Sequence, residues 1–163
     1  MTSSSARSVG WSWRSLGRVI STVMKFILDT MLGNLLTWLR LLGHDTVYWR
    51  GSRDTDLIEA AVSEGRTILT RDSLLHRRAL KWHASSILLP TSETLEALRL
   101  IQSMAGIRMT FNPASTRCPK CNERLEMTSE NPPRWRCPGC GKEYWMGGHW
   151  RNIGIVLEVL SHG

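Results

Sequence analysis

Hydrophobic positions between residues 24 and 106 follow two patterns that alternate along the chain. Short apolar runs bounded by polar residues predict buried strands over 24–29, 45–49, 67–70 and 85–89. Apolar residues at helical spacing predict helices over 31–43, 54–65, 73–83 and 92–106. Repeated strand–helix–strand units with short connections predict an α/β fold with a mainly parallel central sheet covered by helices.

The same patterns set the expected ends and faces of the helices. Asp54 and Ser92 are the expected N-caps of the second and fourth helices, and Gly65 is the expected stop of the second. The inward-facing positions are expected to be the apolar residues at helical spacing: Leu32, Leu35, Leu36, Leu39, Leu42, Leu57, Ile58, Ala61, Val62, Leu74, Leu75 and Leu80.

The regular pattern stops near 111–116, where a cysteine-containing segment begins. We therefore divide the chain into a flexible or targeting extension (1–23), an α/β domain (24–110) and a zinc ribbon with a C-terminal helix (111–163). The extension is rich in Ser and Arg and has no acidic residue, a composition shared by organellar transit peptides. The alternative is a dispensable extension, with Met24 at the start of the first strand as the natural start.

The four cysteines of the chain form two Cys-x-x-Cys pairs, namely Cys118 with Cys121 and Cys137 with Cys140. Residues 122 to 136 separate the pairs, a spacing typical of zinc sites with four thiolate ligands. Such a site has no open position, so the zinc is expected to be structural; the plainer alternative is four reduced, buried cysteines. Gly139 and Gly141 are expected to supply positive φ angles in the second turn. Clustered cysteines favour a reducing compartment, and the expected location is cytoplasmic.

Charge adds a candidate partner. The net charge is +7, from 21 basic and 14 acidic residues, and a basic balance favours a polyanionic partner such as RNA. No apolar run is long enough to cross a bilayer, so no membrane partner is expected. Around the second cysteine pair, basic residues that can contact phosphates alternate with aromatic residues: Arg134, Trp135, Arg136, Lys142, Tyr144 and Trp145. The alternative for the aromatic residues is that they pack the ribbon against the main domain.

Four aspartates are the candidate ligands of a second metal. Asp29 ends the first predicted strand, Asp72 follows the third, and Asp54 and Asp56 open the helix after the second. Ligands of parallel sheets bind beyond the carboxyl ends of the strands, and grouped carboxylates suit Mg²⁺ or Mn²⁺. Each residue also has a plainer role: Asp54 and Asp72 as helix caps, and Asp56 as a favourable charge in a first turn. Asp29 is the exception, because a carboxylate at the end of a buried strand needs a partner.

Three stretches, in order, carry a resemblance to a known family: "FILDTMLGNLLTWLRLLGHDT", "DTDLIEAAVSEGRTILTRDSLL" and the paired Cys-x-x-Cys turns. They resemble the mut-seven C-terminal ribonuclease domain, a branch of the PIN-like nucleases, from about Lys25 to about Arg151. The resemblance implies a PIN-like three-layer α/β/α fold, a metal-dependent ribonuclease site and a structural zinc ribbon. It implies the same four acids as catalytic, magnesium- or manganese-binding residues: Asp29, Asp54, Asp56 and Asp72. Many PIN-like nucleases have a further acid where Ser73 and Leu74 follow Asp72 here, so one or two catalytic metals remain open.

The resulting prediction is an endoribonuclease that hydrolyses RNA phosphodiester bonds with a carboxylate-held divalent ion, aided by the ribbon. The candidate RNA-binding residues are basic: Arg71, Arg77, Arg78, Lys81, Arg134, Arg136 and Lys142. Two alternatives stay open. One is an RNA-binding zinc-ribbon protein without catalysis, and the other is an adaptor that binds proteins through exposed tryptophans.

Overall fold

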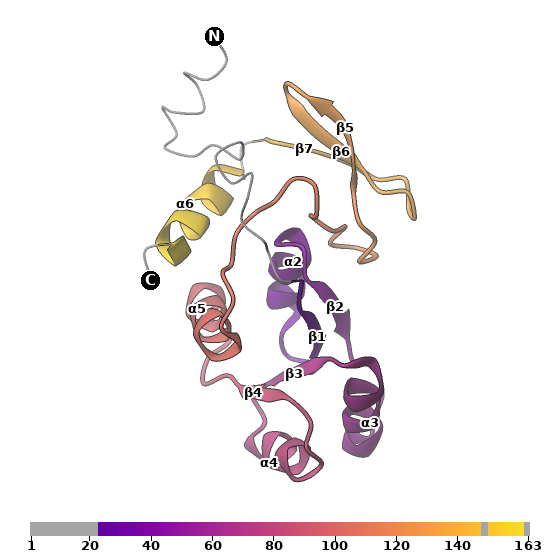
Figure 1. Cartoon of the computed structure of the whole chain (residues 1–163), viewed down its shortest axis with the longest axis vertical. Coiled ribbons are helices and arrows are strands. Elements are labelled where there is room, and N and C mark those ends of the chain that lie inside the picture. Colours follow the sequence, from indigo (N-terminus) through magenta and orange to yellow (C-terminus); the bar gives the residue numbers. More distant parts are fainter. Residues whose placement is uncertain (1–22, 148–149, 162–163) are drawn as a thin grey trace.

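The computed structural model of the chain describes residues 23–147 and 150–161 (Figure 1). The expected N-terminal extension lies outside the described residues, apart from Val23. Within the described residues, each helix is too short or too polar to span a membrane.

The first sheet has four strands in the order β2-β1-β3-β4, and every neighbouring pair is parallel. Its strands are β1 (Lys25–Leu28), β2 (Asp45–Tyr48), β3 (Thr67–Thr70) and β4 (Ser86–Leu88). The helices that follow them are α2 (Gly33–Leu41), α3 (Asp54–Glu64), α4 (Ser73–Lys81) and α5 (Thr94–Ala105). Each of these elements falls inside its predicted range, so the predicted α/β fold with a central parallel sheet is confirmed.

Side chains of β1 alternate between the two faces of the sheet, as the two-residue period of a strand requires. Phe26 and Leu28 lie in a buried cluster with residues of α2 and α5. Ile27 lies in a second cluster with residues of α3 and α4. The sheet is therefore covered by one pair of helices on each face, and this gives three layers (Figure 1).

The C-terminal part forms a second, antiparallel sheet. Its strands are β5 (Glu126–Glu130), β6 (Pro133–Arg136) and β7 (Glu143–Trp145), in that order, and α6 (Trp150–Ser161) follows them. Trp135 of β6 and Leu157 of α6 belong to the same buried cluster as Phe26. The ribbon, α6 and the face of the first sheet that carries α2 and α5 therefore share one hydrophobic core.

Three of the expected inward-facing residues are exposed, and these predictions were wrong. Val62 is 54% exposed, Leu74 49% and Leu80 50%. In α4 the buried residues are Leu75 and Ala79, which lie one helical turn apart. Leu74 and Leu80 lie one position outside this pair, about 100° around the helix axis, and so face solvent.

Two predicted N-caps were also wrong. Asp54 is the first helical residue of α3, and Arg53 occupies the cap position without a side-chain bond. In α5 the cap is Glu93, whose carboxylate accepts the backbone N–H groups of Leu95 and Glu96, rather than the preceding Ser92. The predicted stop at Gly65 is confirmed by its left-handed backbone, with φ of 67°.

Candidate active site and zinc centre

Asp29 lies where two neighbouring strands of the parallel sheet end. Leu28 of β1 pairs with Leu69 of β3, and the Asp29 N–H donates to the Leu69 carbonyl at 3.1 Å. The Asp29 carboxylate is half-buried, and its Oδ1 accepts the Thr30 N–H at 2.7 Å. Backbone pairing and a local hydrogen bond therefore fix this carboxylate at the carboxyl edge of the sheet.

Thr70, the last residue of β3, links the two strand ends. Its buried hydroxyl donates to Asp29 Oδ2 at 3.0 Å and accepts the Asp72 N–H at 2.9 Å. Thr70 was not among the residues predicted from the sequence. A usable signal was present, because Thr70 is a polar residue at the end of an apolar strand and directly precedes the Arg71–Asp72 pair.

Asp72 caps α4, as its plainer role predicted. Its Oδ1 accepts the N–H groups of Leu74 and Leu75 at 2.9 and 3.3 Å. The cap holds the carboxylate at the same sheet edge as Asp29. An ionised carboxylate has about four acceptor positions, so a capping carboxylate can also bind a cation.

Asp54 and Asp56 lie in the first turn of α3, just beyond the carboxyl end of β2. Asp54 Oδ2 lies 3.5 Å from Arg78 Nη1, and both side chains are partly exposed, so this ion pair is weak. We use the term acidic edge for the four aspartates at this end of the sheet: Asp29, Asp54, Asp56 and Asp72.

The acidic edge is not a compact cage. Among the described residues, only the four cysteines form a group of three or more metal-binding side chains with all ligand atoms within 4.8 Å of one another. The structure links Asp29 to the Asp72 backbone through Thr70, whereas Asp54 and Asp56 begin the helix that follows β2 along the chain. It does not bring three of the four carboxylates into mutual contact.

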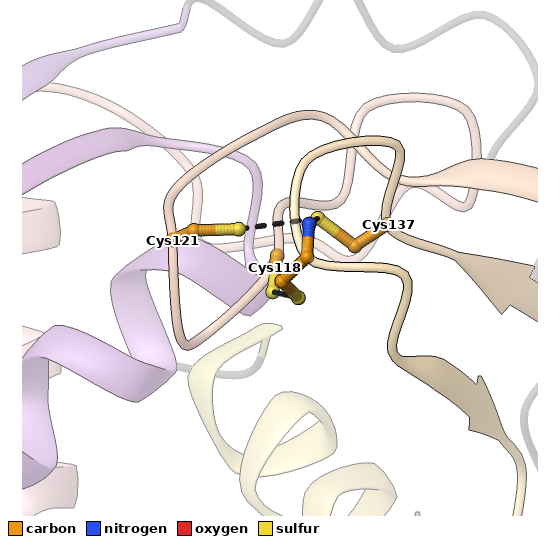
Figure 2. A group of neighbouring side chains, drawn as sticks. Cys118, Cys121 and Cys137 are labelled. Atoms are coloured by element: carbon orange, nitrogen blue, oxygen red, sulfur yellow. Dashed lines mark hydrogen bonds between the residues drawn. The ribbon is translucent and has the colours of Figure 1, made fainter.

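The four cysteine sulfurs do converge, and Figure 2 shows three of these residues, Cys118, Cys121 and Cys137. Cys118 Sγ lies 3.8 Å from Cys140 Sγ, and Cys121 Sγ lies 3.1 Å from Cys137 Sγ. A zinc ion with about 2.3 Å bonds to four sulfurs has ligands about 3.8 Å apart. The Cys118–Cys140 separation matches this distance, the Cys121–Cys137 separation is shorter, and all four sulfurs lie within 4.8 Å of one another, so the cluster is compatible with zinc. Four thiolates fill the tetrahedral shell, and a zinc ion here would be structural.

Both Cys-x-x-Cys turns are built in the same way. The Asn122 N–H donates to the Cys118 carbonyl at 2.9 Å, and the Gly141 N–H donates to the Cys137 carbonyl at 2.8 Å. Asn122 and Gly141 have φ of 67° and 76°. The predicted positive φ at Gly141 is confirmed, and Asn122, which the sequence analysis missed, fills the matching position because Asn tolerates this backbone.

The prediction of a positive φ at Gly139 was wrong, and this glycine serves close packing instead. A Cβ at this position would lie 3.0 Å from Glu123 Cγ and 3.5 Å from Cys121 Sγ. Gly139 therefore lets the two turns approach each other closely enough for their sulfurs to meet.

Tyr144 contacts the cysteine cluster. Its hydroxyl lies 3.1 Å from Cys118 Sγ. Burial opposes ionisation of the Cys118 thiol, but hydrogen bonds from Tyr144 and from the backbone N–H groups of Cys121 and Lys120 outweigh it, and they lower the pKa of Cys118 to about 6. Because the thiolate is the form that binds metal, this contact favours the ligand state.

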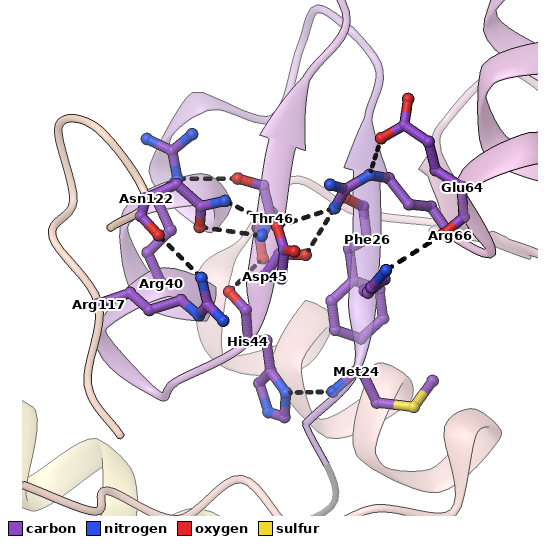
Figure 3. Close-up of polar contacts among 11 residues, drawn as sticks. Met24, Phe26, Arg40, His44, Asp45, Thr46, Glu64, Arg66, Arg117 and Asn122 are labelled. Carbon is purple, nitrogen blue, oxygen red and sulfur yellow. Dashed lines mark hydrogen bonds and ion pairs between the residues drawn. The ribbon is translucent and has the colours of Figure 1, made fainter. Parts of the chain in front are cut away.

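The first cysteine turn is also bonded to the free edge of β2 (Figure 3). Asn122 Oδ1 accepts the Thr46 N–H at 3.1 Å, and Asn122 Nδ2 donates to Asp45 Oδ1 at 2.7 Å. Arg40, in the last turn of α2, is buried and donates to the carbonyls of Thr46 and Pro119, both at 2.8 Å. These bonds cover an edge strand whose polar groups would otherwise be open.

The candidate RNA-binding residues lie on two surfaces. Arg71, Arg77, Arg78 and Lys81 are exposed on or beside α4. Arg134, Arg136 and Lys142 are exposed on the ribbon. Of the aromatic residues, Trp135 is buried and donates from Nε1 to the Pro113 carbonyl at 3.0 Å, so it packs the ribbon as the alternative predicted.

The fold and the cysteine cluster define a parallel α/β domain joined to a zinc-binding ribbon. The sequence model of the Mut7-C RNAse domain matches residues 24–157, which is most of the chain. The chain therefore belongs to the Mut7-C RNAse domain family, as its sequence motifs indicated, and this membership indicates a nuclease-type role with RNA as the substrate. No curated protein and no solved structure gives a significant match.

Proposed function

We propose that the chain is a PIN-like endoribonuclease that hydrolyses RNA phosphodiester bonds with a divalent ion at the acidic edge. One observation carries the proposal in addition to family membership. The Thr70 hydroxyl bonds the Asp29 carboxylate and the Asp72 backbone at the ends of two neighbouring parallel strands. This contact lies at the carboxyl ends of the parallel strands, and α/β folds bind their ligands at that edge of the sheet.

Asp29 and Asp72 are the residues that would hold Mg²⁺ or Mn²⁺, with Asp54 or Asp56 from α3 as a further ligand. The bound ion would supply an activated water and would stabilise the negative charge of phosphodiester cleavage. Thr70 keeps the Asp29 carboxylate in place, and the α4 cap keeps Asp72 in place. The exposed cations near α4 would contact the RNA backbone: Arg71, Arg77, Arg78 and Lys81.

The test separates the charge of each carboxylate from its structural role. Asp72→Asn removes the charge but keeps the N-cap, because Asn and Asp cap helices about equally well. Asp29→Asn keeps a polar partner for Thr70. Each variant is expected to lose at least about 100-fold of Mn²⁺-dependent cleavage of single-stranded and structured RNA.

Glu96→Gln is the matched control, because Glu96 is an exposed acid on α5. It should cleave like the unmodified chain. Unchanged cleavage by both aspartate variants would rule out the nuclease mechanism. Metal-independent RNA binding without cleavage by the unmodified chain would instead favour the alternative of an RNA-binding protein without catalysis, for which the exposed basic residues of the ribbon are the supporting observation.

A further inference from the structure

A cavity of about 500 Å³ lies between α2, the ribbon and the start of α6. Trp38 and Leu41 of α2, Tyr144 and Trp145 of β7, and Trp135 of β6 contribute to its lining. We call this cavity the ribbon pocket. Its volume falls in the range of small-molecule sites, which is about 300 to 1,000 Å³. Its lining is mainly apolar and aromatic, so it suits a flat, π-faced ligand.

Positive charge lies at the ribbon pocket. Lys142 lines it, with Nζ 5.5 Å from the centre of the Tyr144 ring. Arg134 does not line the pocket, but it is the partner of Trp145 across the β6–β7 ladder, so both side chains project from the same face of the sheet. Glu143 is the one acid among the lining residues described. Arg136 lies opposite it in the register of the β6–β7 ladder. The surroundings therefore suit a ligand that joins an aromatic ring to a phosphate.

We infer that the ribbon pocket binds an unpaired base of single-stranded RNA, stacked against Trp145, while Lys142 and Arg134 contact the adjoining phosphates. The inference rests on the proposed function, because it assigns a binding site to the same RNA substrate. Stacking on an aromatic side chain is available to every base, so the pocket would anchor single strands without strict sequence preference.

The ribbon pocket and the acidic edge lie at opposite ends of α2. Asp29 precedes the N-terminus of the helix, and Trp38 and Leu41 lie in its last turn. The nine residues of α2 span about 13 Å at about 1.5 Å per residue. The helix has no acidic residue to repel a phosphate backbone. A strand of a few nucleotides anchored at the pocket can therefore reach the acidic edge.

The experiment measures binding of a short, dye-labelled single-stranded RNA by fluorescence anisotropy, in the zinc-loaded Asp72→Asn chain so that cleavage does not interfere. Trp145→Ala is expected to weaken binding roughly tenfold, and Trp145→Phe much less, because Phe keeps a ring for stacking. Lys142→Gln should also weaken binding and lower the salt slope by about one. Trp82→Ala is the matched control, since Trp82 is 53% exposed and Trp145 is 57% exposed.

An abasic strand of the same length identifies the group that is bound. It should bind the Trp145→Ala chain and its parent equally, because no base is present to stack. Full affinity in both Trp145→Ala and Lys142→Gln would overturn the inference, and so would an equal loss in Trp82→Ala. Concentration-dependent dimerisation that Trp145→Ala abolishes would overturn it as well, by assigning the pocket to a second copy. The binding experiment does not test the proposed nuclease mechanism. That mechanism fails in the separate cleavage assay if Mn²⁺-dependent cleavage survives both aspartate substitutions.

Discussion

At the scale of single residues, Thr70 links two aspartates that are distant in the sequence. Its hydroxyl is both donor and acceptor, and it bonds the carboxylate of Asp29 and the backbone of Asp72 together. The sequence singles out Asp29 and Asp72 as candidates, because each acid follows an apolar strand. It could not predict Thr70 as readily, because a threonine in a strand is ordinary and its partner lies 41 positions away.

His44 gives a pH-dependent prediction at the same scale. Burial, with a further contribution from Arg117, lowers its pKa from 6.5 to about 4. Its Nδ1 accepts the Met24 N–H, and protonation at this atom would remove the acceptor. The folded chain therefore binds fewer protons than the unfolded chain between pH 6.5 and 4, so the stability that His44 contributes is fully present above this range and is lost progressively as the pH falls through it.

The measurement is the free energy of unfolding in urea at pH 7.5 and at pH 5.5. The wild-type chain should lose about 1 kcal/mol more than a His44→Asn variant over this interval. Protonation of the cysteines affects both chains equally and cancels in the difference. His83→Asn, at an exposed position whose φ of 58° Asn tolerates, is the control and should show the wild-type pH dependence. Equal losses in the His44 variant and the wild type would contradict the assignment.

At the scale of elements, the first half of the fold follows from local patterns. The alternation of apolar runs and amphipathic helices located all the elements of the first sheet within a few residues of their observed ends. The wrong predictions concerned which apolar residues of a helix are buried, because the width of the buried face depends on the elements packed against it. Val62 and Leu80 lie beside the buried residues of their helices and are exposed. Hydrogen bonds between residues distant in the chain could not be predicted from the sequence. Asn122 has the sequence context of an ordinary turn residue, yet its side chain bonds to the edge strand β2.

Asn122 provides the prediction at this scale. Asn122→Gly keeps the left-handed backbone of the turn but removes both side-chain bonds to β2. The free energy of unfolding should fall by about 1 to 3 kcal/mol, because the Thr46 N–H and the Asp45 carboxylate lose a partner. Hydrogen exchange at the Thr46 amide should accelerate, and zinc content should stay at about one per chain. An unchanged exchange rate at Thr46 would show that Asn122 does not hold the ribbon on the sheet.

At the scale of the whole molecule, one hydrophobic core joins the α/β domain, the ribbon and α6. The ribbon is thereby fixed beside α2, the helix that starts next to Asp29. In the proposed function, a structural zinc ion would order the ribbon, the ribbon pocket would hold a base, and a divalent ion at the acidic edge would cleave the RNA strand.

The decisive measurement is anomalous scattering from a crystal of the chain soaked in Mn²⁺. A manganese peak is expected about 2.1 Å from carboxylate oxygens of both Asp29 and Asp72, and this peak should be lost in Asp72→Asn crystals. Bound manganese that touches neither aspartate, or a peak that persists unchanged in Asp72→Asn, would contradict a cation held at the acidic edge.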